Sequence, residues 1–186
     1  MQVLIVDHQE VQQWLPMSAC MDVMAETLTT LSRGNAVNPL RHAMWLPDKS
    51  GLIGMMPAYL GDTGVMGLKA ISINAIGSSV AFARELDTAA VVKSKLFVDR
   101  RESTLNEAGD FLFPKKEGAI GDDHIRGEIG EILIDRIGGR ASSEEITLFK
   151  SLGLAAEDVA SAHYIYQKLL KQNEGVWVEF GALKSE

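Results

Sequence analysis

The 186-residue sequence has little cysteine, no excess of basic charge and no long apolar run. Its single cysteine, Cys20, excludes an intramolecular disulfide and is typical of a reducing compartment. The 18 Lys+Arg against 25 Asp+Glu leave a formal net charge of −7, which argues against nucleic-acid or anionic-membrane binding because both need a basic surface. No run of about 20 apolar residues predicts a membrane span, and the start lacks the basic residues of a signal peptide. We therefore expect a cytoplasmic globular protein with no nucleic-acid and no membrane partner.

The common catalytic and cofactor motifs are also missing. There is no Gly-x-Gly-x-x-Gly after a strand, no phosphate-binding loop, no His-Glu-x-x-His and no Gly-x-Ser-x-Gly. Gly61, Gly64 and Gly67 have the wrong spacing for a pyrophosphate turn, and we interpret them as β-turn glycines. With one cysteine and four scattered histidines, the sequence predicts no metal site. We interpret His124 and His163 as surface or interface residues rather than ligands.

The N-terminal residues predict two helices. Asp7 followed by Glu10 is typical of a capping box that begins a short helix ending near Leu15. Residues 16–33 predict a second helix that ends before Gly34, a residue suited to a left-handed cap. Its apolar residues recur at three- and four-residue spacing and predict one buried face: Met17, Cys20, Met24, Leu28 and Leu31.

The rest of the chain predicts an antiparallel part followed by an α/β part. Residues 40–46, 52–60 and 65–73 are expected to be strands of an antiparallel meander, because short turn-forming segments separate them. Beyond Gly77, strands and helices alternate, which favours a parallel sheet. The predicted elements there are a helix capped by Asp87, a strand over 95–99, helices over 102–108 and 122–136, a strand over 146–150, a helix over 155–171 and a strand over 176–180. This last strand can return to the first part.

Two cations, Arg41 and Lys69, fall inside otherwise apolar predicted strands. One interpretation makes them edge-strand charges in solvent. The other makes them a pair that binds a substrate carboxylate, because a cation in an apolar strand is costly unless an anion meets it. In that case Arg41 would bind the carboxylate in a fork and Lys69 would supply a second, titratable donor.

At these residues the chain resembles the ornithine cyclodeaminase/mu-crystallin family of NAD(P)-dependent enzymes. The segment NPLRHAMWLPDKSGLIGMMPAYLGDTGVMGLKAIS resembles the family's substrate-domain meander, and its arginine and lysine match Arg41 and Lys69. The later part of the family's nucleotide domain resembles INAIGSSVAFARELDTAAVVKSKLFVDRRESTLNEAGDF, GEIGEIL and EITLFKSLGLAAEDVASAHYIYQKLL.

A long segment of the family pattern is missing. In the family, further substrate-domain strands, an Arg-Thr-Ala-Ala motif and the Gly-x-Gly pyrophosphate turn separate the lysine strand from the Asn-Ala-Ile-Gly strand. Here Lys69 and Asn74 lie in one strand-like run, which leaves no room for a βαβ unit of roughly 30 residues. We therefore predict an internal deletion with its seam between about residues 70 and 73. The predicted divisions are a substrate-binding and dimerisation part (1–72), a remnant of the Rossmann-like domain (73–172) and a returning C-terminal strand (173–186).

The resemblance implies roles for six residues. It implies that Arg41 and Lys69 bind the carboxylate of a small amino acid or cyclic imine, with Lys69 as the proton donor. It implies cofactor contacts at four positions: Asn74, Ser79, Lys150 and Ser151. Ser79 stands where the cyclodeaminases have an acidic residue. This favours cyclic imine (ketimine) reduction as the parent activity, unless Ser78 and Ser79 merely cap a loop.

Three functional hypotheses follow from the resemblance. The first is a shortened NAD(P)-dependent enzyme that is inactive or weak alone and does not bind NAD or NADP tightly, because glycines that let backbone N–H groups approach the pyrophosphate are missing. The second is a non-catalytic, ligand-binding module that forms a homodimer through strand edges. The third is that two or more such chains, or this chain and a separate nucleotide-domain fragment, complement one another into an active enzyme.

Overall fold

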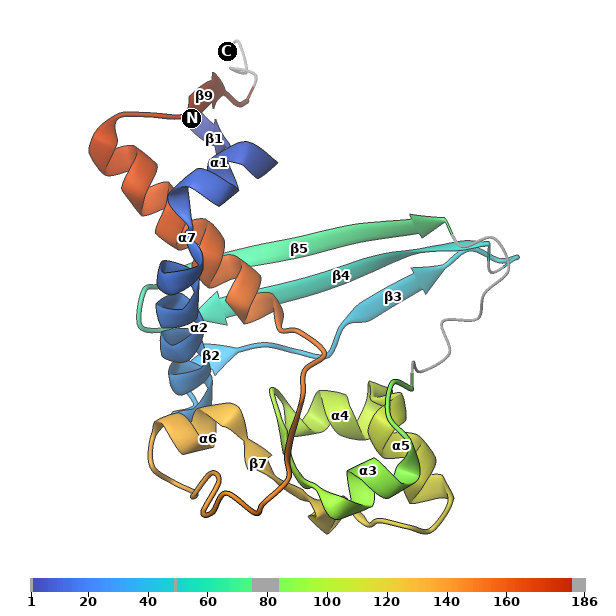
Figure 1. The fold of residues 1–186 in the computed structure, drawn as a ribbon. Helices are drawn as coiled ribbons and strands as arrows, with labels where there is room; N and C mark the ends of the chain where they lie inside the picture. The colour runs from blue at the N-terminus through green and yellow to red at the C-terminus, as the bar shows by residue number, and fades with distance from the viewer. Residues whose placement is uncertain (1, 49, 75–83, 182–186) are drawn as a thin grey trace.

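The computed structural model describes residues 2–48, 50–74 and 84–181 as a mixed α/β fold (Figure 1). The strands are β1 (Gln2–Ile5), β2 (Ala36–Val37), β3 (His42–Trp45), β4 (Gly51–Leu60), β5 (Val65–Asn74), β6 (Lys95–Val98), β7 (Ile125–Glu128), β8 (Thr147–Lys150) and β9 (Val176–Glu179). The helices are α1 (His8–Trp14), α2 (Met17–Ser32), α3 (Thr88–Lys93), α4 (Arg101–Glu107), α5 (Gly109–Lys116), α6 (Ile129–Leu133) and α7 (Ala155–Gln172), with a 3₁₀ turn, η1, at Asp122–His124. The strands form three separate sheets.

The two ends of the described chain lie side by side (Figure 1). Strand β9 pairs antiparallel with β1, so the last strand returns to the N-terminal part. Strand β1 itself was not predicted. The capping box that begins α1 is confirmed, because Asp7 Oδ1 accepts from the Glu10 amide and Glu10 Oε2 accepts from the Asp7 amide, both at 2.9 Å.

Helix α2 has the predicted bounds, but the prediction of its buried face was partly wrong. Leu28 and Leu31 are buried, whereas Met17 is 73% exposed, and Cys20 and Met24 are only half-buried. The buried face of the helix instead includes two threonines and a valine. Its buried residues are Val23, Thr27, Leu28, Thr30 and Leu31. Buried threonine hydroxyls need partners, which the structure supplies at Val23 O and Asp62. Gly34 has φ of +77°, which confirms the left-handed cap.

The predicted antiparallel meander is confirmed as the sheet in which β4 pairs with β2, β3 and β5. Its register pairs Leu60 with Val65 at the turn and Gly51 with Asn74 at the far end. Strand β5 is therefore one uninterrupted ten-residue strand that carries both Lys69 and Asn74.

Helix α7 covers one face of this sheet and packs beside α2 (Figure 1). The shared core contains residues of α2, of β4 and of the start of α7: Leu28, Leu31, Ala58, Leu60, Leu154, Ala155, Ala156 and Val159. Residues far apart in the sequence thus form one core, which fixes where α7 begins relative to the sheet.

The predicted parallel sheet is confirmed as β7-β6-β8. The helix predicted over 122–136 was wrong, because this segment holds η1, β7 and the short α6. Gly127 and Gly130 would each weaken a long helix, whereas Ile125 and Gly127 alternate as buried residues of a strand paired with β6. Helix α5 was missed, since glycine begins it and Pro114 lies inside it. Its Phe111 is fully buried under the sheet.

Over the part of the chain that the structure describes, no helix combines the length and the apolar character needed to cross a membrane.

Candidate functional site

The strand register brings Arg41 and Lys69 to opposite sides of one residue, Met56. Lys69 of β5 pairs with Met56 of β4. On the other side of β4, His42 of β3 pairs with Met55. Arg41 directly precedes His42, and Arg41 and Met56 line one small hollow. Neighbouring residues in a row across antiparallel strands project from the same face. Met56 therefore has Lys69 beside it on β5 and Arg41 beside it in the hollow.

Both cations pair with carboxylates of this chain. Arg41 Nε lies 2.8 Å from Glu107 Oε2 of α4, and its Nη2 donates to Leu152 O at 3.3 Å. Lys69 Nζ lies 2.9 Å from Asp158 Oδ2 in the first turn of α7. The side chains of Arg41 and Lys69 are 39% and 42% exposed. Ion pairs this exposed are worth up to about 1 kcal/mol, so a ligand carboxylate can exchange with Glu107 or Asp158.

The start of α7 beside these cations is held by side chains from two other segments. The buried carboxylate of Asp99, which follows β6, accepts hydrogen bonds from the Leu152 amide at 2.6 Å and the Gly153 amide at 2.8 Å. Asn38 Oδ1 accepts from the Ala156 amide at 2.9 Å. The bond from Asn38 satisfies a donor that the first turn of a helix leaves without a partner, and the bonds from Asp99 hold the loop that leads into α7.

Glu157 lies among these groups and is half-buried. Its Oε2 accepts from the Leu154 amide at 3.1 Å. Burial raises the pKa of Glu157, and the nearby Asp99 and Asp158 carboxylates raise it further, against the opposing effects of the Leu154 amide and Lys69. The site therefore holds a carboxyl group that binds its proton more tightly than an ordinary glutamate does.

Lys150 and Ser151, predicted to contact a cofactor, make contacts within the chain. Lys150 Nζ lies 2.8 Å from the buried Asp110 Oδ2 and 3.0 Å from Glu85 Oε2. Burial alone would lower the pKa of Lys150, but its hydrogen bonds with Asp110 and Glu85 outweigh this and raise that pKa. Ser151 donates to Asp99 Oδ2 at 2.9 Å.

Asn74, also predicted as a cofactor contact, is the last residue of β5, and the structure describes only its backbone pairing with Gly51. Ser79 lies outside the described residues. Ser151 is the one predicted cofactor residue that the structure places beside the pair of cations, since its neighbour Leu152 accepts from Arg41.

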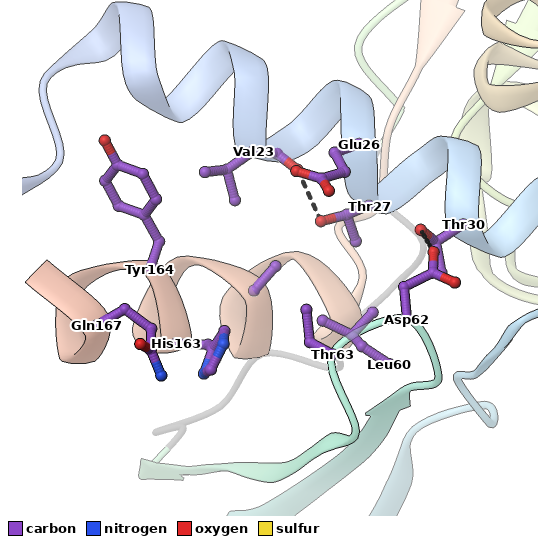
Figure 2. Close-up of a pocket in the computed structure, with 11 residues that line it drawn as sticks. Val23, Glu26, Thr27, Thr30, Leu60, Asp62, Thr63, His163, Tyr164 and Gln167 are labelled. Carbon is purple, nitrogen blue, oxygen red and sulfur yellow. Dashed lines mark hydrogen bonds between the residues drawn. The ribbon is translucent and has the colours of Figure 1, made fainter.

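A second concavity lies between α2 and α7, above the β4–β5 turn (Figure 2). It has a volume of about 170 Å³. Figure 2 shows Tyr164 rising from α7 toward α2 at one end, and Asp62 lying under Thr30 at the other. This cavity is separate from Arg41 and Lys69, neither of which lines it. The described residues contain no group of three His, Cys, Asp or Glu side chains placed to hold a metal ion.

Comparison with known proteins matches residues 70–173, more than half of the chain, to the ornithine cyclodeaminase/mu-crystallin family. The chain belongs to this family. It is 40% identical over 113 residues to a Δ1-pyrroline-2-carboxylate reductase of Bacillus cereus, a match that covers 60% of this chain and 35% of the relative. The chain thus matches about a third of the length of such curated family members.

Solved structures share the fold of the family member described here. The complex of Thermococcus litoralis Δ1-pyrroline-2-carboxylate reductase with NADH and L-proline superposes with a TM-score of 0.84 at 21% identity, over 94% of this chain and 99% of that chain. An archaeal alanine dehydrogenase dimer with bound NAD superposes with a TM-score of 0.78 at 18% identity, over 97% and 100%. The α/β fold class is therefore confirmed.

The described turns after β6 and β7 offer few free amides to the pyrophosphate of a dinucleotide. After β6, the Arg100 amide donates to Asp99 Oδ1 at 2.7 Å and the Arg101 amide donates to Glu128 Oε1 at 2.8 Å. The donors that would face a phosphate are therefore bonded to carboxylates, which also repel an anion. Gly130 of α6, after β7, lies against the Leu28 carbonyl of α2, so its lack of a side chain serves helix packing.

Sequence reasoning missed the partners of the two cations. Glu107 was predicted only as part of a helix, and Asp158 only as part of another. Their distances in sequence from Arg41 and Lys69 carry no pairing signal. Asn38 and Asp99 were missed for the same reason, although the position of Asp99 directly after a buried parallel strand is typical of a functional edge.

Proposed function

We propose that this chain is a shortened member of its family, with an internal deletion that removed the first half of the nucleotide domain. Three observations support this. The strand β5 runs without interruption from Lys69 to Asn74. The family match begins at residue 70, inside the predicted seam. The 113 matched residues are 35% of the Bacillus cereus relative, which is therefore about 320 residues long, against 186 here.

The parent activity that we propose is NAD(P)-dependent reduction of a cyclic imine, or amino-acid cyclodeamination. The first is supported by the names of the reductases that resemble the chain and by Ser79 in place of an acidic residue. In the parent reaction Lys69 would hold the proton that is transferred to the substrate. This chain alone is expected to be inactive or weak.

The function retained in this chain is the binding of a small amino acid or cyclic imine through its carboxylate. One observation supports this proposal: Met56 pairs with Lys69 across β4 and β5, and the same Met56 lines a hollow with Arg41. Binding would exchange Glu107 and Asp158 for the ligand carboxylate. Arg41 would donate from its guanidinium fork and Lys69 from its ammonium group.

Calorimetric titration of the protein with L-proline and with Δ1-pyrroline-2-carboxylate tests the proposal. We expect saturable binding that Arg41→Gln and Lys69→Gln each weaken at least tenfold, because each removes one of two charged donors. Lys171→Gln, at the far end of α7, is the matched control and should bind as the wild type does. Equal binding by all three variants would refute the assignment of the site.

We further propose that NAD or NADP binds weakly or not at all. The carboxylates of Asp99 and Glu128 at the turn after β6 support this, since they occupy amide donors that a pyrophosphate needs. The expected result is no saturable change in nicotinamide fluorescence when NADH or NADPH is titrated with the protein. Saturation in the micromolar range would contradict it. The lone cysteine supports a cytoplasmic location.

A second candidate function is a non-catalytic, dimerising, ligand-binding module. It is favoured by the sheet face opposite α7, whose apolar side chains are 40–80% exposed: Val37, Met44, Ile53, Met55, Tyr59, Met66 and Leu68. An apolar area of this kind is typical of a protein interface. We expect a homodimer in sedimentation experiments. A stable monomer at low concentration would remove this candidate.

A further inference from the structure

The cavity between α2 and α7 has an apolar floor and an acidic border (Figure 2). The apolar side chains that we call its floor come from three elements: Val23 of α2, Leu60 of β4 and Ala160 of α7, of which Val23 and Leu60 are buried. Tyr164 closes one end of this space with its ring (Figure 2). The volume of about 170 Å³ is close to that of an engineered apolar cavity of about 150 Å³ that admits benzene. The space therefore suits one six-membered ring.

The charge around this space is negative. Glu26 of α2 and Asp62 of the β4–β5 turn line it, and His163 is its one basic residue among those described. Hydrogen bonds from Thr30 and then Asn35 lower the pKa of Asp62 against the effect of burial, and the positive charge of nearby Arg33, which does not line the space, lowers it further, so that Asp62 is ionised at neutral pH. Glu26 has no ion pair or hydrogen bond within the described structure, so its carboxylate is available to a ligand.

Lys168 of α7, one turn beyond Tyr164, is directed away from the cavity. Lys168 places its ammonium group 4.6 Å from the centre of the Tyr164 ring and donates to Trp14 O of α1 at 3.5 Å. It does not line the cavity. Glu26 at the border can therefore pair with a positive group, while the apolar side chains of the floor can contact a ring.

We propose that this cavity is a binding site for a small organic ammonium ion that carries one apolar ring. The ring would lie against Val23, Leu60 and Ala160, and the ammonium group would pair with Glu26 in the field of Asp62. This site is independent of the carboxylate site at Arg41 and Lys69. The group recognised in this cavity is a cation, whereas the group recognised at Arg41 and Lys69 is an anion.

Calorimetry with cyclohexylamine, supported by amide chemical-shift mapping, tests the proposal on the full chain. Saturable binding of cyclohexylamine is expected, with shifts concentrated on α2 and α7. Cyclohexanol, which has the same ring without the charge, should bind several-fold more weakly, and cyclohexanecarboxylate should not bind. Equal binding of the amine and the alcohol, or shifts that fall elsewhere, would overturn the proposal.

Two variants test the charge of Glu26 and the volume of the cavity separately. Glu26→Gln should weaken cyclohexylamine about threefold to fivefold, as expected for a partly exposed ion pair, and leave cyclohexanol unchanged. Asp22→Asn, an exposed acid on the same helix outside the cavity, is its control and should have no effect. Ala160→Leu should fill the space and abolish binding of the amine. An unchanged affinity in Glu26→Gln would refute the proposal even if Ala160→Leu fails to fold.

The carboxylate site provides a further control. Arg41→Gln should leave cyclohexylamine binding unchanged, because Arg41 does not line the cavity. Loss of L-proline binding and retention of amine binding in that variant would therefore report on the two sites separately.

Discussion

Substitution of Lys150 by methionine is expected to destabilise the fold strongly, although the resemblance to the family marks Lys150 as a cofactor contact. Lys150 neutralises Asp110, whose residue is only 3% exposed and whose Oδ2 lies 2.8 Å from Lys150 Nζ. Asp110 Oδ1 also accepts from the amides of Glu85 and Leu86, at 2.7 and 2.9 Å. Removal of the lysine leaves a buried carboxylate without its counter-charge.

Breaking a buried ion pair from one side costs about 3–5 kcal/mol. For a protein of this length, each kcal/mol lowers the melting temperature by about 2–4 °C, so Lys150→Met should melt about 6–20 °C below the wild type. Thermal and urea unfolding followed by circular dichroism measure this change. Lys115→Met, which breaks an exposed pair with Asp122, is the matched control and should cost less than about 1 kcal/mol. A Lys150→Met protein as stable as Lys115→Met would refute the structural role of the pair.

The same ion pair predicts how stability changes with pH. Burial alone would raise the pKa of Asp110, but hydrogen bonds from Lys150, Leu86 and Glu85 outweigh it and lower that pKa. The stabilisation from Asp110 is therefore complete above its ordinary pKa of 3.8 and is lost as the pH falls through the lowered value. The pKa of Lys150 is raised, so its contribution is complete below its ordinary pKa of 10.5 and is lost as the pH rises through the raised value. Lys150→Met should abolish the change at high pH and weaken or reverse the change at low pH, because burial, which raises the pKa of Asp110, is then opposed only by the Leu86 and Glu85 amides.

Three further substitutions test other contacts. Gly130→Ala should destabilise by about 1–3 kcal/mol in urea unfolding, because a Cβ there would lie 2.3 Å from the backbone oxygen of Leu28, which cannot move freely; a neutral effect would contradict the close approach of α6 to α2. Glu157→Gln should stabilise the folded protein at pH 7, because the raised pKa makes the charged carboxylate unfavourable there. This advantage should vanish below the ordinary pKa of 4.5, where Glu157 is protonated in the folded and unfolded states. A difference in unfolding free energy that does not change with pH would count against the raised pKa. Asn38→Ala should cost about 0.5–2 kcal/mol, since it removes the acceptor of the Ala156 amide, and faster hydrogen exchange of that amide checks it; unchanged exchange would show that the contact does not protect the helix start.

Much of the candidate site could be placed on its elements from the sequence, because the signals were local. The turn segments between apolar runs predicted the three-stranded meander, whose register pairs Lys69 with Met56, and Arg41 directly precedes the strand on the other side of β4. The same local signals failed at residues 122–136, where apolar residues at helical spacing belong to a strand and a separate short helix. Periodicity alone does not distinguish one continuous helix from two adjacent elements that contribute to one core.

The sequence by itself determined the α/β class, the family and the absence of a glycine-rich turn, because composition, motifs and short-range patterns carry that information. Only the tertiary structure decided which acids meet the two cations, that Asp99 and Asn38 hold the start of α7, and that Lys150 neutralises Asp110. These contacts join residues 40 to more than 110 positions apart. Burial and ion pairing depend on distance in space, and the packing of α7 on the meander sets that distance.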